Sequence, residues 1–148
     1  MKQAMKPATT FPQVLGQVLV IRRRSKKATQ HDVAKALDLS QSAYSRLERG
    51  EAAFNVPQLR RTAAALGVPV SKLFEDAEKG AAGLAKDGVE VLEDVPEEQA
   101  KVRWAWVAPK VIETKVQTAL ARVHWSYDPY AKTKVKQEVQ VHLGIRRE

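Results

Sequence analysis

The chain has 148 residues, a formal net charge of +8 and no cysteine. This length allows one domain with a substantial core plus a smaller module, and the lack of cysteine excludes disulfides and thiolate metal sites. No stretch approaches the roughly 18 consecutive apolar residues of a membrane-spanning helix, and the N-terminus lacks the apolar region of a secretory signal. We therefore expect a cytoplasmic protein that makes no membrane contact.

The positive charge is concentrated in the first half of the chain. Residues 1–75 hold 13 lysines and arginines against 5 acidic residues, whereas residues 76–148 hold 12 of each. A basic surface attracts the phosphates of nucleic acid. The distribution therefore indicates that any nucleic-acid contact lies in residues 1–75.

The first expected elements are a flexible arm over residues 1–9, which are polar and contain Pro7, and a helix behind it. This helix should begin after Thr10, a good N-cap, and run to about Ser25. Its apolar residues recur at i, i+3, i+4, i+7 and i+8, as on one face of a helix. They are Phe11, Val14, Leu15, Val18 and Leu19.

Five cations lie within six residues at the end of this helix: Arg22, Arg23, Arg24, Lys26 and Lys27. Cations near a helix C-terminus interact favourably with the helix dipole, but five are more than that role requires. If the chain binds nucleic acid, we expect at least one or two of them to contact its phosphate backbone. The candidates are Arg23, Arg24, Lys26 and Lys27.

Residues 29–49 predict two short helices joined by a tight turn. The apolar positions of each helix fall on one face, and Ser40 is a good N-cap for the second helix. The outward face of the second helix is polar and contains no acid; it consists of Gln41, Ser42, Ser45, Arg46 and Arg49. Such side chains suit a helix that enters the major groove of DNA, because they offer forked donors and acceptors to base edges and cations to phosphates.

Five short segments carry a family pattern: Thr29-Gln30, Val33-Ala34, Leu39-Ser40-Gln41-Ser42, Tyr44–Gly50 and Ala64–Val68. On these residues the sequence resembles the Xre family, the lambda-repressor and Cro type of helix-turn-helix protein, over residues 11–75. The resemblance implies a five-helix domain over residues 10–79 that binds double-stranded DNA, in a regulator of bacterial or phage type.

The resemblance also assigns roles to single residues. Base contacts are expected from Gln41, Ser42, Ser45 and Arg46, and backbone contacts from Gln30, Ser40 and Arg49, besides the basic cluster. Three positions depart from the family pattern. Arg22 stands where an apolar residue is usual, which predicts a less well packed helix end, and Lys27 and Asp38 stand where glycine is frequent. Asp38 then takes a left-handed conformation at some cost.

Two further helices complete the expected domain. Asn55 is the expected N-cap of a helix that ends at Gly67. The next helix begins at Val70 and ends near Lys79, or continues to Lys86. Residues 80–98 then read as an acidic linker that contains three glycines and Pro96.

Residues 99–148 predict a small α+β module of a strand, a helix and a strand. Alternating apolar residues favour strands over 102–108 and 135–143, and helical spacing covers 111–123, although part of the same stretch also alternates like a strand. Large aromatic residues gather here: Trp104, Trp106, Trp125 and Tyr127. They form either an interface with a second copy or the core of the module itself.

The sequence shows no catalytic or cofactor chemistry. The three histidines are scattered, and no phosphate loop or nucleophile elbow is present. We therefore expect no enzyme activity, metal site or cofactor. The favoured function is a sequence-specific repressor or other regulator, acting as a homodimer or tetramer on an inverted-repeat operator. The alternative is an antitoxin whose C-terminal half binds a partner protein while its N-terminal half regulates the shared operon.

Overall fold

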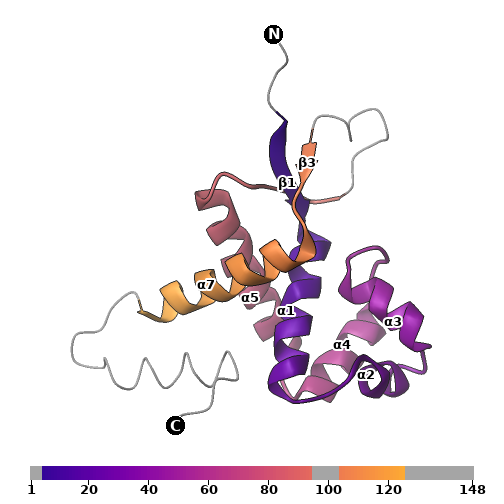
Figure 1. Ribbon diagram of the computed structural model, residues 1–148. Helices are drawn as coiled ribbons and strands as arrows, with labels where there is room; N and C mark the ends of the chain where they lie inside the picture. Colours follow the sequence, from indigo (N-terminus) through magenta and orange to yellow (C-terminus); the bar gives the residue numbers. More distant parts are fainter. Residues whose placement is uncertain (1–4, 95–103, 126–148) are drawn as a thin grey trace.

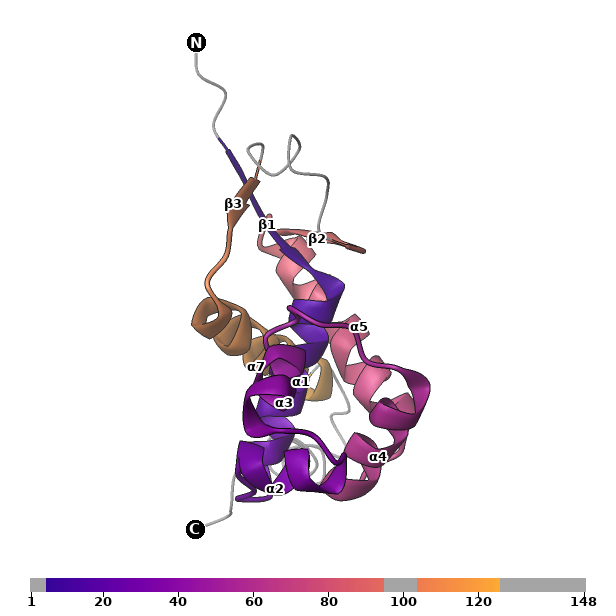
Figure 2. The ribbon, with the colours of Figure 1, turned by 90° about the vertical axis from the view of Figure 1, so that its right-hand side faces the viewer.

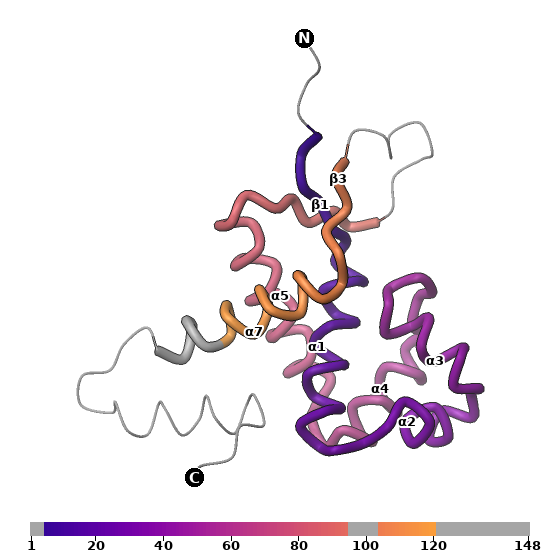
Figure 3. Tube along the Cα trace, in the orientation of Figure 1, coloured from indigo at the N-terminus to yellow at the C-terminus, as the bar shows by residue number. Residues whose placement is uncertain are grey.

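The computed structural model describes residues 5–94 and 104–125, with only the backbone described for 121–125. The described elements are β1 (Lys6–Thr10), α1 (Phe11–Ser25), α2 (Gln30–Ala36), α3 (Gln41–Glu48), α4 (Val56–Leu66), α5 (Val70–Lys86), β2 (Glu90–Leu92), β3 (Trp104–Trp106) and α7 (Pro109–Trp125). Helix α1 is central: α2, α3 and α4 gather on one side of it, and α5 and α7 pack on the other (Figures 1 and 3). The mainly helical fold with a small α+β part confirms the predicted class.

Helix α1 has the predicted bounds. The Thr10 hydroxyl accepts a hydrogen bond from the backbone N–H of Gln13 at 3.3 Å, which caps the first turn. The expected weakness at Arg22 is not observed, because its guanidinium lies 2.6 Å from the fully buried carboxylate of Asp76 in α5. An ion pair takes the place of an apolar contact between these two helices.

The turns around α2, α3 and α4 follow the predicted backbone geometry. Lys27 and Asp38 have φ angles of 56° and 54°, in the left-handed region that favours glycine. Asn55 and Gln58 form a capping box at the start of α4, and Gly67 ends α4 with φ of 69°. These local signals explain why this part of the fold could be predicted closely.

The N-terminal residues form the central strand of a parallel sheet with the order β2-β1-β3 (Figure 2). In this sheet Ala8 is aligned with both Glu90 and Trp106. The predicted flexible arm is therefore wrong for residues 6–9, whereas residues 1–4 lie outside the described residues. Pro7 argues against a central strand, and the pairing partners are more than 80 positions away, so the local sequence gave no sign of this strand.

The predicted acidic linker over residues 80–98 is wrong in its first part. Helix α5 continues to Lys86, as one reading of the sequence allowed, and residues 90–92 form β2. The glycines that suggested a linker permit close helix packing: a Cβ at Gly83 would lie only 2.4 Å from the Cβ of Ala119 in α7. A Cβ at Gly80 would lie 3.1 Å from Val116.

Helix α7 belongs to the same core as α1, the first helix of the predicted helix-turn-helix region. One continuous cluster of buried apolar residues joins α1, α5 and α7, with Val14, Leu84, Ile112, Val116 and Leu120 among its members. The linker predicted between residues 79 and 99 therefore does not divide the described residues into two separate cores. The strand predicted around 102–108 is observed as β3 over residues 104–106, and the helical reading of 111–123 is confirmed by α7. Residues 102 and 103 and the strand predicted at 135–143 lie outside the described residues.

Candidate nucleic-acid interface

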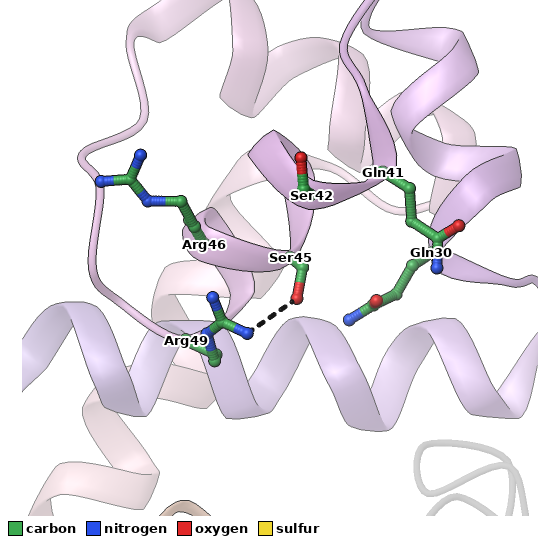
Figure 4. A pocket seen from close by; sticks show the side chains of 6 residues that line it. All are labelled: Gln30, Gln41, Ser42, Ser45, Arg46 and Arg49. Carbon is green, nitrogen blue, oxygen red and sulfur yellow. Dashed lines mark hydrogen bonds between the residues drawn. The ribbon is translucent and has the colours of Figure 1, made fainter.

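Six polar side chains from α2, α3 and the C-cap of α3 line a surface hollow of about 430 Å³, which we call the reading hollow (Figure 4). They are Gln30, Gln41, Ser42, Ser45, Arg46 and Arg49. The lining contains amides, hydroxyls and guanidinium groups and no acid, the donor and acceptor types that read base edges in the major groove. The structure thus brings the four predicted base-contact residues together with two predicted backbone-contact residues. Their contacts with DNA stay predictions.

The N-terminus of α3 is ordered by Ser40. Its hydroxyl accepts the backbone N–H of Ala43 at 3.1 Å and lies 3.3 Å from the hydroxyl of Ser42. The remaining N–H groups of the first turn have no partner within the helix and carry partial positive charge. A phosphate near Ser40 would therefore meet a favourable field.

The inner face of α3 holds the helix against α1. Tyr44, Leu47 and Glu48 are buried on this face. A Cβ at Gly16 of α1 would lie 1.9 Å from the carbonyl oxygen of Glu48. Because only glycine leaves room for this approach, Gly16 determines how deeply α3 sits on α1.

Glu48 organises a polar network beneath the reading hollow. Its carboxylate accepts hydrogen bonds from Arg23 at 2.6 and 3.2 Å and from the side-chain amide of Gln30 at 3.1 Å. Arg23 also donates to the carbonyl oxygen of Ala28 at 3.1 Å. Glu48 and Arg23 are 1% and 12% exposed, so the prediction that Arg23 contacts the DNA backbone is corrected: its guanidinium is used within the fold. The same network orients Gln30 from below.

Sequence reasoning missed Glu48. The signal was present, because Glu48 follows Tyr44 by one helical turn and thus lies on the apolar face of α3. A charge on such a face needs an opposite charge nearby, and the basic end of α1 supplies it. Burial, followed by the negative charge of Glu48, raises the pKa of the Tyr44 phenol, so Tyr44 stays neutral beside this network.

The other cations of the basic cluster have different surroundings. Arg24 is 56% exposed and lies 2.6 Å from Glu113 of α7. Lys26 is exposed, with its ammonium 3.4 Å from the position of a Cβ at Gly67. Lys27 is exposed on the turn between α1 and α2. Lys26 and Lys27 therefore stay candidates for backbone contacts, and Arg24 would have to exchange Glu113 for a phosphate.

The start of α2, which carries Gln30, is fixed by a capping box. The backbone N–H of Thr29 donates to the Asp32 carboxylate at 2.9 Å, and the Thr29 hydroxyl accepts the N–H of Asp32 at 3.1 Å. The first of these bonds, more than any other influence, keeps the pKa of Asp32 below its usual value. Asp32 is therefore charged at neutral pH, and Gln30 begins a firmly capped helix.

Glu51 is a second acid that sequence reasoning missed. It follows α3 by a short turn and is exposed. Its carboxylate accepts two hydrogen bonds from Arg49, both of 3.1 Å, and lies 4.0 Å from Nε of Arg46. Two cations of the reading hollow thus have an acidic neighbour.

Two of the four aromatic residues of the predicted oligomer interface, Trp104 and Trp106, lie in β3. Trp104 is half-buried and Trp106 is 40% exposed. Val111, at the start of α7, is 44% exposed. The Trp125 side chain and Tyr127 lie outside the described residues.

Comparison with known proteins decides the family. A model described as a helix-turn-helix domain matches residues 14–73. The control protein C.MunI of a Mycoplasma species is 32% identical over 59 residues, which are 40% of this chain and 80% of that protein. The chain belongs to the Xre-type helix-turn-helix family of transcriptional regulators. No solved structure matches the chain.

Membership of this family makes the protein a DNA-binding regulator of transcription. The matched residues contain α2, α3 and the whole reading hollow, whereas β1, β2, β3 and α7 lie outside the match. No helix of the described segments has the length and apolar character needed to span a membrane. Among the same residues, no group of three or more His, Asp and Glu side chains is arranged to hold a metal ion.

Proposed function

We propose that this helix-turn-helix protein is a sequence-specific regulator that binds an inverted-repeat operator as a homo-oligomer. The observation that carries the proposal is the reading hollow, in which amide, hydroxyl and guanidinium groups converge on an outward face without an acid in its lining. The printed name of the Mycoplasma relative, a control protein, supports a regulatory role.

Base readout is assigned to Gln41, Ser42, Ser45 and Arg46, which lie on the outward side of α3. Arg46 is 61% exposed along its side chain. Its guanidinium has Nε 4.0 Å from the Glu51 carboxylate and is exposed, so it can reach O6 and N7 of a guanine, the commonest specific contact in the major groove.

Backbone contacts are assigned to the residues around the hollow. Gln30 at the start of α2 and Ser40 at the cap of α3 offer polar groups near two helix N-termini, where phosphates bind favourably. Lys26, Lys27 and Arg49 add cations, and Arg24 does so if it leaves Glu113. These contacts position the protein and read no sequence.

A second copy supplies the remaining specificity. One recognition helix reads few base pairs, and two half-sites about one DNA turn apart compensate for this. We assign the contact between copies to the exposed apolar side chains of Trp106 and Val111, with Trp104 beside them. Sedimentation of a Trp106→Ser, Val111→Ser variant should show a smaller species than the wild-type protein, and an unchanged mass would contradict this assignment.

The test of readout starts with a site selected by the purified protein from random DNA. Arg46→Ala should cost ~1–3 kcal/mol on this site and much less on random DNA, and preference at one base pair in each half-site should disappear. Gln30→Ala should weaken both kinds of DNA by similar factors, because backbone contacts are independent of sequence. If Arg46→Ala lowers every affinity equally, Arg46 contacts only phosphate.

A further inference from the structure

Glu51 is held beside the reading hollow by the turn that ends α3. Gly50 has φ of 71°, and its N–H donates to the carbonyl oxygen of Leu47 at 3.1 Å. The N–H of Glu51 donates to the carbonyl oxygen of Arg46 at 3.0 Å. This pair of bonds is the Schellman arrangement, and it directs the chain back toward α3 instead of away from it.

The side chain of Glu51 accepts hydrogen bonds from two of the five N–H donors of Arg49. Nε and Nη2 of Arg49 donate to the two carboxylate oxygens of Glu51, each at 3.1 Å. Nη1 of Arg49 donates to the hydroxyl of Ser45 at 3.3 Å (Figure 4). Arg49 thus lies along α3 in a forked pair with Glu51, while it also holds Ser45.

This ion pair matters little for stability. Both partners are 51% exposed along their side chains, and such exposed ion pairs contribute little to the free energy of unfolding. The pair does affect the charge that DNA meets, because an arginine in a forked carboxylate pair is already neutralised. A phosphate must displace Glu51 before it can take the same guanidinium.

We propose that Glu51 is a specificity-determining residue. Its ion pair with Arg49 restrains Arg49 from binding phosphates in DNA of any sequence. The inference rests on the proposed function, in which α3 reads bases and Arg49 lies beside the backbone. Phosphate contacts strengthen binding to every sequence alike. Specificity is the difference between the affinities for the specific site and for random DNA. A group that weakens the complex with random DNA therefore raises specificity.

Removing the Glu51 charge should act differently on the two kinds of DNA. On random DNA, a released Arg49 gains a phosphate contact. On the selected site, the same gain is offset because Arg49 no longer holds Ser45 in its reading position. The ratio of specific to random affinity should therefore fall, while both complexes become more sensitive to salt.

The experiment compares Glu51→Gln with Glu75→Gln by measuring affinity for the selected duplex and for a random duplex over a range of salt. Glu75 is also 51% exposed and also pairs with a cation, Lys79 at 2.7 Å, but it lies on α5 and does not touch the reading hollow. Both changes raise the net charge by one. Only Glu51→Gln should raise random-DNA affinity by about threefold or more at low salt and steepen the log–log salt slope by about 0.9 per bound protomer.

A double-mutant cycle with Arg49→Gln shows whether Glu51 acts through Arg49. In the Arg49→Gln background, Glu51→Gln should change neither the salt slope nor the ratio of affinities beyond the effect of Glu75→Gln. A full effect in that background would overturn the proposal. Equal effects of Glu51→Gln and Glu75→Gln would overturn it too, since only overall charge would then matter.

Failure of the proposed function can be distinguished from failure of the inference about Glu51. If the wild-type protein binds the selected and random duplexes equally, sequence-specific readout is wrong, yet the salt slopes on random DNA still test the restraint on Arg49. If Glu51→Gln lowers affinity for the selected duplex and leaves affinity for the random duplex and its salt slope unchanged, Arg49 gains no phosphate contact and the restraint is refuted. Equal thermal unfolding midpoints of the variants establish that the fold is intact.

Discussion

The helix-turn-helix region (α1 to α4) and the sheet–α7 region (β1, β2, β3, the end of α5, and α7) are held by different kinds of contact. In the first region, neighbouring short helices are fixed by caps, left-handed turns and the buried Arg23–Glu48 pair. In the second, strands and helices far apart in the sequence meet through apolar side chains and glycines. The second region packs against α1 of the first. The reading hollow therefore depends on local structure, whereas the sheet–α7 region that supports it depends on long-range packing.

The largest effect should follow removal of α7. A fragment that ends at residue 94 loses the buried side chains of Ile112, Val116 and Leu120. At ~1.5–3 kcal/mol for each buried aliphatic side chain, the loss is about 5 kcal/mol or more, comparable to the whole stability of many domains. Denaturant unfolding of fragments 1–94 and 1–125 measures it, because the longer fragment keeps every described element.

Equal unfolding midpoints of the two fragments would contradict the shared core. They would mean that the helix-turn-helix region is stable by itself and that α7 only adheres to it. The predicted difference would instead show that the two regions fold as one body.

A smaller loss should follow Glu48→Gln in the helix-turn-helix region. The change leaves Arg23 buried without a charged partner, which costs about 3–5 kcal/mol. The double variant Arg23→Met, Glu48→Met should recover much of this, because apolar replacements of a buried pair are often well tolerated. Thermal or denaturant unfolding measures the change in stability of both variants. A double variant as unstable as Glu48→Gln would show that the unpaired Arg23 charge does not cause the loss of stability.

Removal of the central strand tests the sheet. Deleting residues 1–9 removes β1, with which both β2 and β3 pair, and uncovers the neighbours of the fully buried Ala8. At about 1 kcal/mol for each lost hydrogen bond, we expect a loss of about 2–4 kcal/mol. A deletion of residues 1–4 keeps β1 and serves as the control; equal unfolding curves for the two deletions would refute the role of β1.

The smallest effect concerns Gly83. Alanine in a helix is usually more stable than glycine by roughly 0.5–1 kcal/mol. Here Gly83→Ala should destabilise by about 1–3 kcal/mol, because the added methyl would collide with Ala119. Adding Ala119→Gly should restore space and recover stability in a thermal unfolding experiment. A stabilising Gly83→Ala would show that α5 and α7 are not in close contact.

The two regions also differ in how far the sequence predicted them. Thr10, Ser40 and Asn55 mark helix starts within a few residues, so the bounds of α1, α3 and α4 followed from local signals. The composition of the reading hollow followed from the outward face of α3.

Long-range contacts have no local sequence signal comparable to these helix caps. Residues 6–9 become a strand because they pair with residues near 90 and 105, and residues 80–86 become helix because glycines fit against α7. The roles of Arg23 and Glu51 likewise depend on which charges the fold brings together. A count of cations in the sequence could not separate a buried arginine from one that is available to DNA.

The most direct test of the account is a backbone amide NMR titration of the full chain with a random-sequence DNA duplex. If DNA binds at the reading hollow, the largest chemical-shift changes should fall at Gln30 and in residues 40–49. Changes in residues 80–92 and 104–120 should be small, because this part packs against α1 on the side away from α2 and α3. Largest shifts at β3 or along α7, with little change in α3, would contradict the assignment of DNA binding to the helix-turn-helix region.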